Sequence, residues 1–320
     1  MITLAQTLED QKDLRKLCTP SSKNRYELFW PNDNYGFAHL MKVYAGYPVK
    51  EPIYASFPHG MCNRDNVVSI SELEADFPSL LYYPPFKGDL WKKVAKTKKV
   101  YPFASPIHYA LKLFQPEFPV EKRQGTLFLP QHTTMKAETK YNREALLAEL
   151  ADLPDEFKPV TICLHWQDLE KGVDKFFTEH GYDFVCAGHL SDSDYIFRWL
   201  HLISQFKLVA HCGFGSALFY SVLAGVPFYL TKEYAEPVLH DDFKPFHKPV
   251  PEFTKAGLNR TKMLRKIFGK PVSEITREQR DIVNYWTYAD AVKSPAELNK
   301  FFHMLKARYE EDRIRMKYGV

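Results

Sequence analysis

Residues 206–230, FKLVAHCGFGSALFYSVLAGVPFYL, hold a strand, a helix and a second strand, and they decide the fold class. The apolar run at 206–212 predicts a buried strand, and residues 215–225 carry apolar side chains at helical spacing. VPFYL at 226–230 predicts the next strand. Gly213 and Gly215 mark the turn between the first strand and the helix. The segment therefore predicts a βαβ unit with parallel strands.

The same alternation extends upstream of this segment. Further strands are predicted at 126–134, 160–166 and 183–189, and helices at 142–153, 168–181 and 192–205. These strands are continuous apolar runs, which is typical of a parallel sheet covered on both faces. Regular alternation of strands and helices predicts a doubly wound, Rossmann-like α/β domain.

The first 120 residues predict a second α/β unit of less regular pattern. Its expected strands lie at 25–30, 52–60, 79–85 and 99–105, and its expected helices at 5–17, 36–47 and 90–99. The proline-rich, charged stretch at 116–125 is the best candidate for a linker, residues 240–265 are expected to be irregular, and helices are expected at 274–286 and 295–316. We therefore expect an N-terminal α/β unit (1–120), a second Rossmann-like unit (121–240) and an irregular and helical C-terminal segment packing back on the core (241–320).

Composition and charge narrow the class of protein. The chain has 320 residues, of which 45% are hydrophobic and 26% charged, as in ordinary globular proteins. A net charge of +4 is too weak to argue for nucleic acid as a partner. The chain has no apolar run long enough for a membrane helix and no secretory signal peptide, so we expect a cytoplasmic protein. Its five scattered cysteines form no CxxC pair and are expected to be reduced, mostly as core residues.

Histidines follow several predicted strands at the point where each strand ends. They are His59, His132, His165, His189 and His211. Ligands of open parallel sheets bind outside the carboxyl ends of the strands. These five side chains are therefore the first candidates for a functional site.

The turn between the strand ending at His211 and the following helix is the sharpest local feature. Gly213 and Gly215 allow a tight turn, and the first amides of the helix would point outward with Ser216 beside them. A helix N-terminus carries free N–H donors and a partial positive charge, which suit a phosphate group. The alternative is a simple helix cap with small residues for packing.

Each histidine also has a functional and a structural interpretation. His59, between Pro58 and Gly60, could remove a proton from a hydroxyl group or could cap a turn. His132 with Thr133 could hold phosphate or sugar oxygens. His165 could line the cleft or belong to the core, and His189 could contact a base or a ribose.

Metal ligands and membrane contacts have weaker signals. The sequence has no HExxH and no cysteine cluster, and its Asp-x-Asp stretch at Asp192–Asp194 is interpreted as part of a helix cap with acidic first-turn residues, so we expect no metal site and no cofactor apart from the substrate. A run of lysines is either a solvated helix face or a candidate for peripheral contact with a membrane or an anionic lipid-linked acceptor: Lys92, Lys93, Lys96, Lys98 and Lys99.

Two α/β units with HCGFGSALFYSVLAGVPFYL in the second resemble the GT-B glycosyltransferase architecture. FPHG at 57–60 is similar to the acceptor-side His-Gly loop of bacterial surface-polymer transferases, including CDP-glycerol glycerophosphotransferases and relatives acting on sialic acid or Kdo donors. The resemblance implies a metal-independent transfer of a sugar from a CMP-, UDP- or CDP-linked donor to a hydroxyl of a glycan or lipid-linked acceptor. It implies that His59 is the general base and that Gly213, Gly215 and Ser216 bind the donor phosphate. By position, His132, Thr133, His165, His189 and His211 are candidates for donor or sugar binding.

One residue departs from the family pattern. Many GT-B enzymes carry a glutamate for the donor ribose five residues before the glycine of the Ala224-Gly225-Val226-Pro227 step, and Tyr220 stands there in this chain. Glu233 and Glu236 are candidates to replace it. Three other functions remain open: a non-hydrolysing sugar-nucleotide epimerase, a polyol-phosphate transferase, and a catalytically silent binding protein. The sequence also leaves the oligomeric state open.

Overall fold

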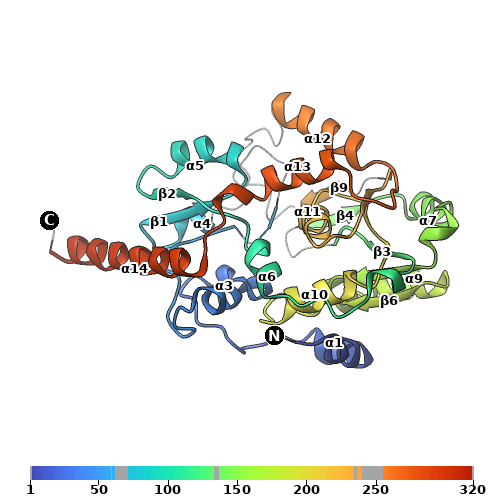
Figure 1. The fold of residues 1–320 in the computed structure, drawn as a ribbon, viewed down its shortest axis with the longest axis horizontal. Helices are drawn as coiled ribbons and strands as arrows, with labels where there is room; N and C mark the ends of the chain where they lie inside the picture. Colours follow the sequence, from blue (N-terminus) through green and yellow to red (C-terminus); the bar gives the residue numbers. More distant parts are fainter. Residues whose placement is uncertain are drawn as a thin grey trace.

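A five-stranded parallel sheet forms the centre of the second unit (Figure 1). The computed structural model describes residues 2–58, 60–61, 71–132, 137–233, 236–239 and 255–318. The strands run in the order β6 (Asp183–Cys186), β5 (Val160–Leu164), β3 (Thr126–Leu129), β7 (Leu208–His211) and β8 (Phe228–Leu230). All five predicted strands are confirmed. From the central β3 the chain builds outward through β5 and β6, then crosses to β7 and β8 on the other side. The strand order therefore reverses between β3 and β7.

Both faces of this sheet are buried, as the continuous apolar runs predict. Leu127 and Val209 belong to a hydrophobic cluster on one face, whereas Phe128, Leu208 and Ala210 belong to a second cluster on the other. Successive side chains of a strand point to opposite faces, so each strand supplies both clusters. The α/β class with a Rossmann-like parallel sheet is thus confirmed.

The helices of the second unit follow the predicted alternation. They are α7 (Arg143–Ala151), α8 (Trp166–Glu170), α9 (Val173–Glu179), α10 (Tyr195–Ile203) and α11 (Ser216–Leu223). Asn142 caps α7 as expected, since its Oδ1 accepts the N–H of Ala145 at 3.0 Å. The single helix predicted at 168–181 is divided, because Gly172 adopts a positive φ of 72° that a helix interior does not allow.

The first unit is built on a smaller sheet. Strands β1 (Ser79–Tyr82) and β2 (Lys99–Pro102) are parallel, and one isolated bridge joins Ser56 to Leu80. Its helices are α3 (Phe37–Ala45), α4 (Ser71–Glu74), α5 (Gly88–Val94) and α6 (Ile107–Leu113). The strand expected at 52–60 is therefore reduced to a single bridge in its described part.

The strand predicted at 25–30 is wrong for a physical reason. Side chains, and not a neighbouring strand, pair with the backbone here: Asp33 accepts the N–H of Glu27 at 3.3 Å. The carboxylate of Glu27 in turn accepts the N–H of Ile53 at 2.9 Å and pairs with Lys42 at 2.7 Å. Because the side chains of Glu27 and Lys42 are fully buried, this ion pair fixes an irregular segment in place.

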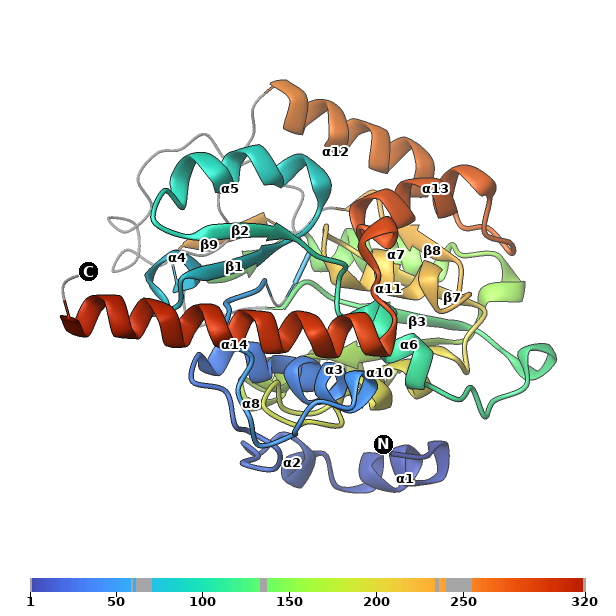
Figure 2. The ribbon, with the colours of Figure 1, turned by 60° about the vertical axis from the view of Figure 1, so that its left-hand side comes forward.

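The two ends of the chain pack against different parts of the body (Figure 2). At the N-terminus, α1 (Leu4–Asp10) packs against α10, and α2 (Leu14–Leu17) lies beside β6. At the C-terminus, α13 (Arg277–Trp286) packs against α11, and α14 (Pro295–Tyr318) crosses α3. The expectation of irregular structure at 240–265 is wrong from residue 255 on, where α12 (Lys255–Phe268) begins. A short antiparallel pair, β4 (Ala137–Lys140) with β9 (Glu236–Leu239), was not predicted.

The N-terminal segment is joined to the edge strand β6 by a side-chain amide. Gln11 donates to the carbonyl of Cys186 at 3.0 Å and accepts the N–H of the same residue at 2.9 Å. The thiols of Cys18 and Cys186 lie 3.6 Å apart in the core, so two cysteines far apart in sequence are neighbours in space. In the part of the chain that the structure describes, no helix combines the length and the apolar character needed to cross a membrane.

We predict that Gly36→Ala destabilises the fold far more than Gly46→Ala. Both glycines adopt a positive φ, which costs another residue roughly 1–2 kcal/mol. A Cβ at Gly36 would also collide with the backbone carbonyl of Ser193, whereas a Cβ at Gly46 meets nothing within 4 Å. Urea unfolding of both variants measures the difference, and equal losses would contradict the close contact between α3 and the second unit.

Candidate functional site

A pocket of about 330 Å³ opens at the carboxyl ends of β3, β5 and β7. Leu129, Gln131 and His132 line it from the end of β3, His165 from the end of β5, and His211 from the end of β7. This is the point where the strand order reverses, and open α/β sheets bind ligands at such a point. Three of the five candidate histidines, His132, His165 and His211, therefore lie together at this edge of the sheet, and their role in binding stays a prediction.

The N-terminus of α11 forms one side of the pocket. Gly215, Ser216 and Ala217 line it, and the first amides of a helix have no acceptor within the helix. The first unit meets the second at the same place, because the N–H of Met61 donates to the Oγ of Ser216 at 2.9 Å. The turn between β7 and α11 therefore faces an opening between the two units and is more than a buried cap.

His211 is held as a neutral hydrogen-bond donor beside this helix terminus. Its Nδ1 accepts the N–H of Gly213 at 2.9 Å, which places the ring proton on Nε2. A Cβ built on Gly215 would lie 3.5 Å from this Nε2, so the protonated edge of the ring faces the start of α11. Burial lowers the pKa of His211 to about 3, because a charged ring would lose its hydration.

The same local arrangement recurs at the ends of two other strands. His165 Nδ1 accepts the N–H of Gln167 at 3.4 Å, and His189 Nδ1 accepts the N–H of Ser191 at 3.0 Å. Burial lowers the pKa of both rings. Each of the three histidines therefore caps the backbone two residues ahead and keeps its proton on Nε2.

The rings of His132, His165, Trp166 and His189 form a row that leads away from the pocket, in which the first two are stacked and the others tilted. His132 and His165 stack with centroids 4.2 Å apart, and Trp166 lies 4.1 Å from His189 at the far end. His189 is not among the residues that line the pocket. Its ring supports Trp166, and its position does not bring it to the ligand space.

The two glycines of the turn serve different purposes from those expected. Neither Gly213 nor Gly215 has a positive φ, so neither is needed for its conformational freedom. Gly213 leaves room for the side chain of Gln131, with which a Cβ at this position would collide. The N–H of Gly213 donates to His211 Nδ1. Gly215 and Ser216 line the pocket and Gly213 is not among the lining residues, so phosphate binding stays a prediction for Gly215 and Ser216.

Two predicted site residues, His59 and Thr133, lie outside the described residues. Pro58 and Gly60, on either side of His59 in the chain, both line the pocket. His59 as a base and Thr133 as a ligand stay predictions.

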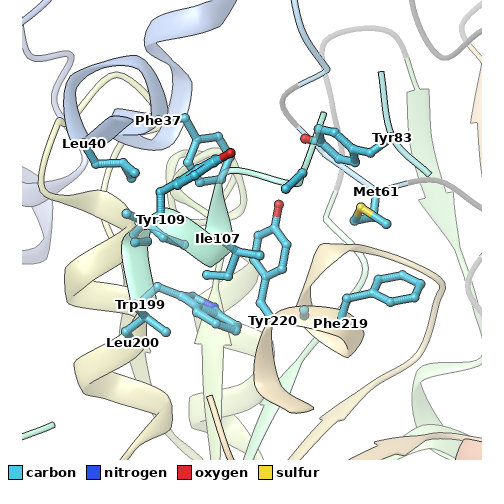
Figure 3. Close-up of a cluster of buried hydrophobic side chains, with 14 of the residues drawn as sticks. Phe37, Leu40, Met61, Tyr83, Ile107, Tyr109, Trp199, Leu200, Phe219 and Tyr220 are labelled. Atoms are coloured by element: carbon cyan, nitrogen blue, oxygen red, sulfur yellow. The ribbon is translucent and has the colours of Figure 1, made fainter. Parts of the chain in front are cut away.

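Tyr220, at the position where many GT-B enzymes carry a ribose-binding glutamate, connects the two units. Its hydroxyl lies 3.5 Å from that of Ser105, and it also bonds to Ser216. Ser105 bonds in addition to Tyr83, whose hydroxyl donates to the carbonyl of Pro58. Figure 3 shows the hydroxyls of Tyr83 and Tyr220 approaching each other from different sides of the boundary. Burial raises the pKa of both tyrosines, so the bridge stays protonated.

Sequence reasoning missed the other half of the lining. Aromatic side chains come from η2 (Trp30–Gly36), α3, α10 and α11: Tyr35, Phe37, Tyr195, Trp199 and Tyr220. Glu72 of α4 also lines the pocket, although it is only 1% exposed. Nothing in the sequence separates SELE at 71–74 from an ordinary solvated helix, so no signal marked this carboxylate.

Charged groups and metal ligands at the site are few within the described ranges. Arg265 of α12 lies with its guanidinium carbon 5.8 Å from the ring centroid of Phe214, which lines the pocket. Glu233, a candidate for the ribose contact, instead accepts the N–H of Asn142 at 2.6 Å ahead of α7. No three His, Cys, Asp or Glu side chains of the described segments are grouped so that they could hold a metal ion.

We predict that His211→Asn makes stability less dependent on pH. The pKa of His211 falls from its ordinary value of about 6.5 to about 3 on folding, so in this range the unfolded chain binds the extra proton. The free energy of unfolding therefore falls as the pH drops from 6.5 to 3, by up to about 1.4 kcal/mol per pH unit from this ring. Asparagine keeps an acceptor for the N–H of Gly213 and removes this titration. Urea unfolding at several pH values checks the slope against the exposed His180→Asn, and an unchanged slope in His211→Asn would contradict a neutral His211.

Comparisons with known proteins add little beyond this geometry. No family model matches the chain, and no curated protein matches it. Among solved structures, a GtfA/B complex aligns at 11% identity with a TM-score of 0.33 over 73% of this chain, and the wall teichoic acid polymerase TagF at 9% identity with a TM-score of 0.36 over 75%. The alignments span 46% and 60% of those two chains.

Proposed function

We propose that this chain is a glycosyltransferase that binds a nucleotide-linked sugar donor in the pocket at the ends of β3, β5 and β7. One observation carries the proposal: a helix N-terminus and the Nε2–H of a 93% buried, neutral histidine face the same opening between two α/β units. The exposed fraction of His211 is 7%, and its Nδ1 is already occupied by the backbone. The GT-B resemblance of HCGFGSALFYSVLAGVPFYL assigns the donor phosphate to this turn.

The donor phosphate would accept hydrogen bonds from groups that are already in place. These are the first amides of α11, the hydroxyl of Ser216 and the Nε2–H of His211. When the bond between the sugar and the phosphate breaks, its electron pair leaves with the phosphate oxygen. Fixed donors at that oxygen stabilise the developing charge without reorganisation, which is the largest single contribution in many enzymes.

The acceptor hydroxyl would enter from the side of Pro58 and Gly60. Its oxygen forms the new bond to the sugar carbon, and its proton passes to a base, for which His59 is our candidate. The N–H of Met61 bonds to Ser216, so the acceptor-side turn and the phosphate-side helix belong to one hydrogen-bonded unit. We take the acceptor to be a glycan or a lipid-linked glycan of a bacterial surface polymer, as the FPHG loop implies.

We predict that one of CMP, UDP, CDP and GDP raises the melting temperature of the protein. A ligand at 100 times its Kd adds about 2.7 kcal/mol to the free energy of unfolding. Gly215→Val should abolish the effect, because an extended residue tolerates valine while the side chain fills the phosphate position. Its Cβ meets only His211, at 3.5 Å, so the unliganded protein should stay folded. Ala224→Val, at the other end of α11, is the control. No response to any nucleotide would favour the silent binding protein.

We further predict that His59→Ala lowers the rate of sugar transfer by about 10²–10⁴-fold and leaves nucleotide binding intact. The nucleotide that stabilises the protein selects the donors for this assay, and release of the free nucleotide from its sugar conjugate measures the rate. Transfer at the wild-type rate would remove His59 from the chemistry.

A further inference from the structure

Cys18 and Cys186 form a pair of thiols at the contact between the N-terminal segment and β6. Their sulfur atoms lie 3.6 Å apart, although the two residues are separated by 168 positions in the chain. Cys18 is the C-terminal cap of α2, and Cys186 is the last residue of β6, an outer strand of the sheet. Neither thiol lines the pocket or takes part in the proposed transfer reaction, so what they can do is independent of that function.

The backbone on both sides of the thiol pair is held in place. The side-chain amide of Gln11 bonds to the N–H and to the carbonyl of Cys186. Next to it, the carbonyl of Leu17 accepts the N–H of His189 at 3.1 Å. A disulfide joins its sulfur atoms at about 2.0 Å, so these two need to approach by only about 1.5 Å, a shift that side-chain rotation can supply. The geometry therefore favours a bond between Cys18 and Cys186.

The two thiols differ in acidity and in access from solvent. The hydrogen bond between them lowers the pKa of Cys18, and the same bond together with burial raises the pKa of Cys186. Cys18 is 7% exposed and Cys186 only 1%. A cavity of about 830 Å³ between the N-terminal segment and the start of α10 is lined by Leu17 and Thr19, the residues on either side of Cys18. A small oxidant therefore meets Cys18 first, and Cys18 is the better nucleophile of the two.

We propose that Cys18 and Cys186 form a reversible disulfide when the protein meets hydrogen peroxide. The sulfur of Cys18 attacks one peroxide oxygen, the O–O bond breaks, and a sulfenic acid and one water molecule form. The sulfur of Cys186 then attacks the sulfenic sulfur, and the hydroxyl of the sulfenic acid leaves as a second water molecule with the Cys186 proton. In total the two thiols lose two protons and two electrons to the peroxide. A small thiol reductant restores both by thiol–disulfide exchange.

The disulfide would lock the N-terminal segment onto the outer strand. In the reduced protein only non-covalent contacts hold this segment, among them the amide of Gln11 and the N–H of Ser21, which donates to the hydroxyl of Ser191 at 2.8 Å. A covalent bond across 168 positions restricts the chain whenever the segment opens. Oxidation therefore keeps β6 covered.

Peptide mapping of the wild-type protein without reduction tests the bond. The protein is treated with hydrogen peroxide, and the remaining thiols are blocked with N-ethylmaleimide. Trypsin then releases Cys18 in peptide 17–23 and Cys186 in peptide 176–198, each as the single cysteine of its peptide. We expect the two peptides to be joined, at a mass two hydrogen atoms below the sum of the free peptides, and dithiothreitol to separate them. Two free thiols, irreversible oxidation of Cys18 without a bond, or a bond from either cysteine to Cys163 would overturn the proposal.

Native proteolysis tests the lock. Trypsin cuts after Arg15 and Lys16 only when α2 opens, so the rate of cleavage follows the population of the open segment. Peroxide should slow this cleavage about tenfold in the wild-type protein, and dithiothreitol should restore the rate. Peroxide should not slow it in Cys18→Ala. Cys163→Ala is the matched control, because Cys163 is also buried on the neighbouring strand β5, and it should behave as the wild type. Equal rates in the reduced and oxidised wild-type protein would contradict the lock, whatever the variants do.

Discussion

The pairing of β3 with β7 is the constraint on which the site depends. Thr126 pairs with Leu208, and the register continues until Leu129 stands beside His211. Both strands therefore end at the same level, and their following loops emerge side by side. A shift of this register would carry Gln131 and His132 away from the start of α11. The buried alternation of side chains on the two faces of the sheet makes such a shift costly.

The second constraint is the hydrogen-bonded contact between the units. A chain of hydrogen bonds connects the carbonyl of Pro58 to the start of α11 through the hydroxyls of Tyr83, Ser105, Tyr220 and Ser216. The N–H of Met61 also donates to Ser216, so the segment after Pro58 contacts the same helix start. Buried hydroxyls are costly unless each finds a partner, so these four side chains favour one relative position of the two turns. Tyr220 thus makes a contact between the two units at the position where the GT-B resemblance implies a ligand contact.

The sequence predicts the second unit well because each of its strands can be recognised from its own residues. The continuous apolar runs ending at Leu129, Leu164 and His211 specify buried strands, and Asn142 caps its helix locally, whereas the helical pattern at 168–181 does not reveal the break at Gly172. The first unit is harder, because the pairing of Glu27 with Lys42 and Ile53 is a long-range contact that no local pattern reveals. At the site, His132, His165 and His211 can be selected from the sequence because each follows a predicted strand, and all three line the pocket. Glu72 and Tyr35 depend on how distant segments meet, and His189 is turned away by its packing against Trp166.

The contact of Gln11 with β6 also has a consequence for how the protein behaves in a crowded solution. β6 is an outer strand, and the unpaired backbone of such a strand is a template for another chain. The side-chain amide of Gln11 offers Cys186 one donor and one acceptor, which are the groups a neighbouring strand would offer. The N-terminal segment therefore covers this edge of the sheet, and its removal would expose the backbone of β6 to pairing with a second molecule.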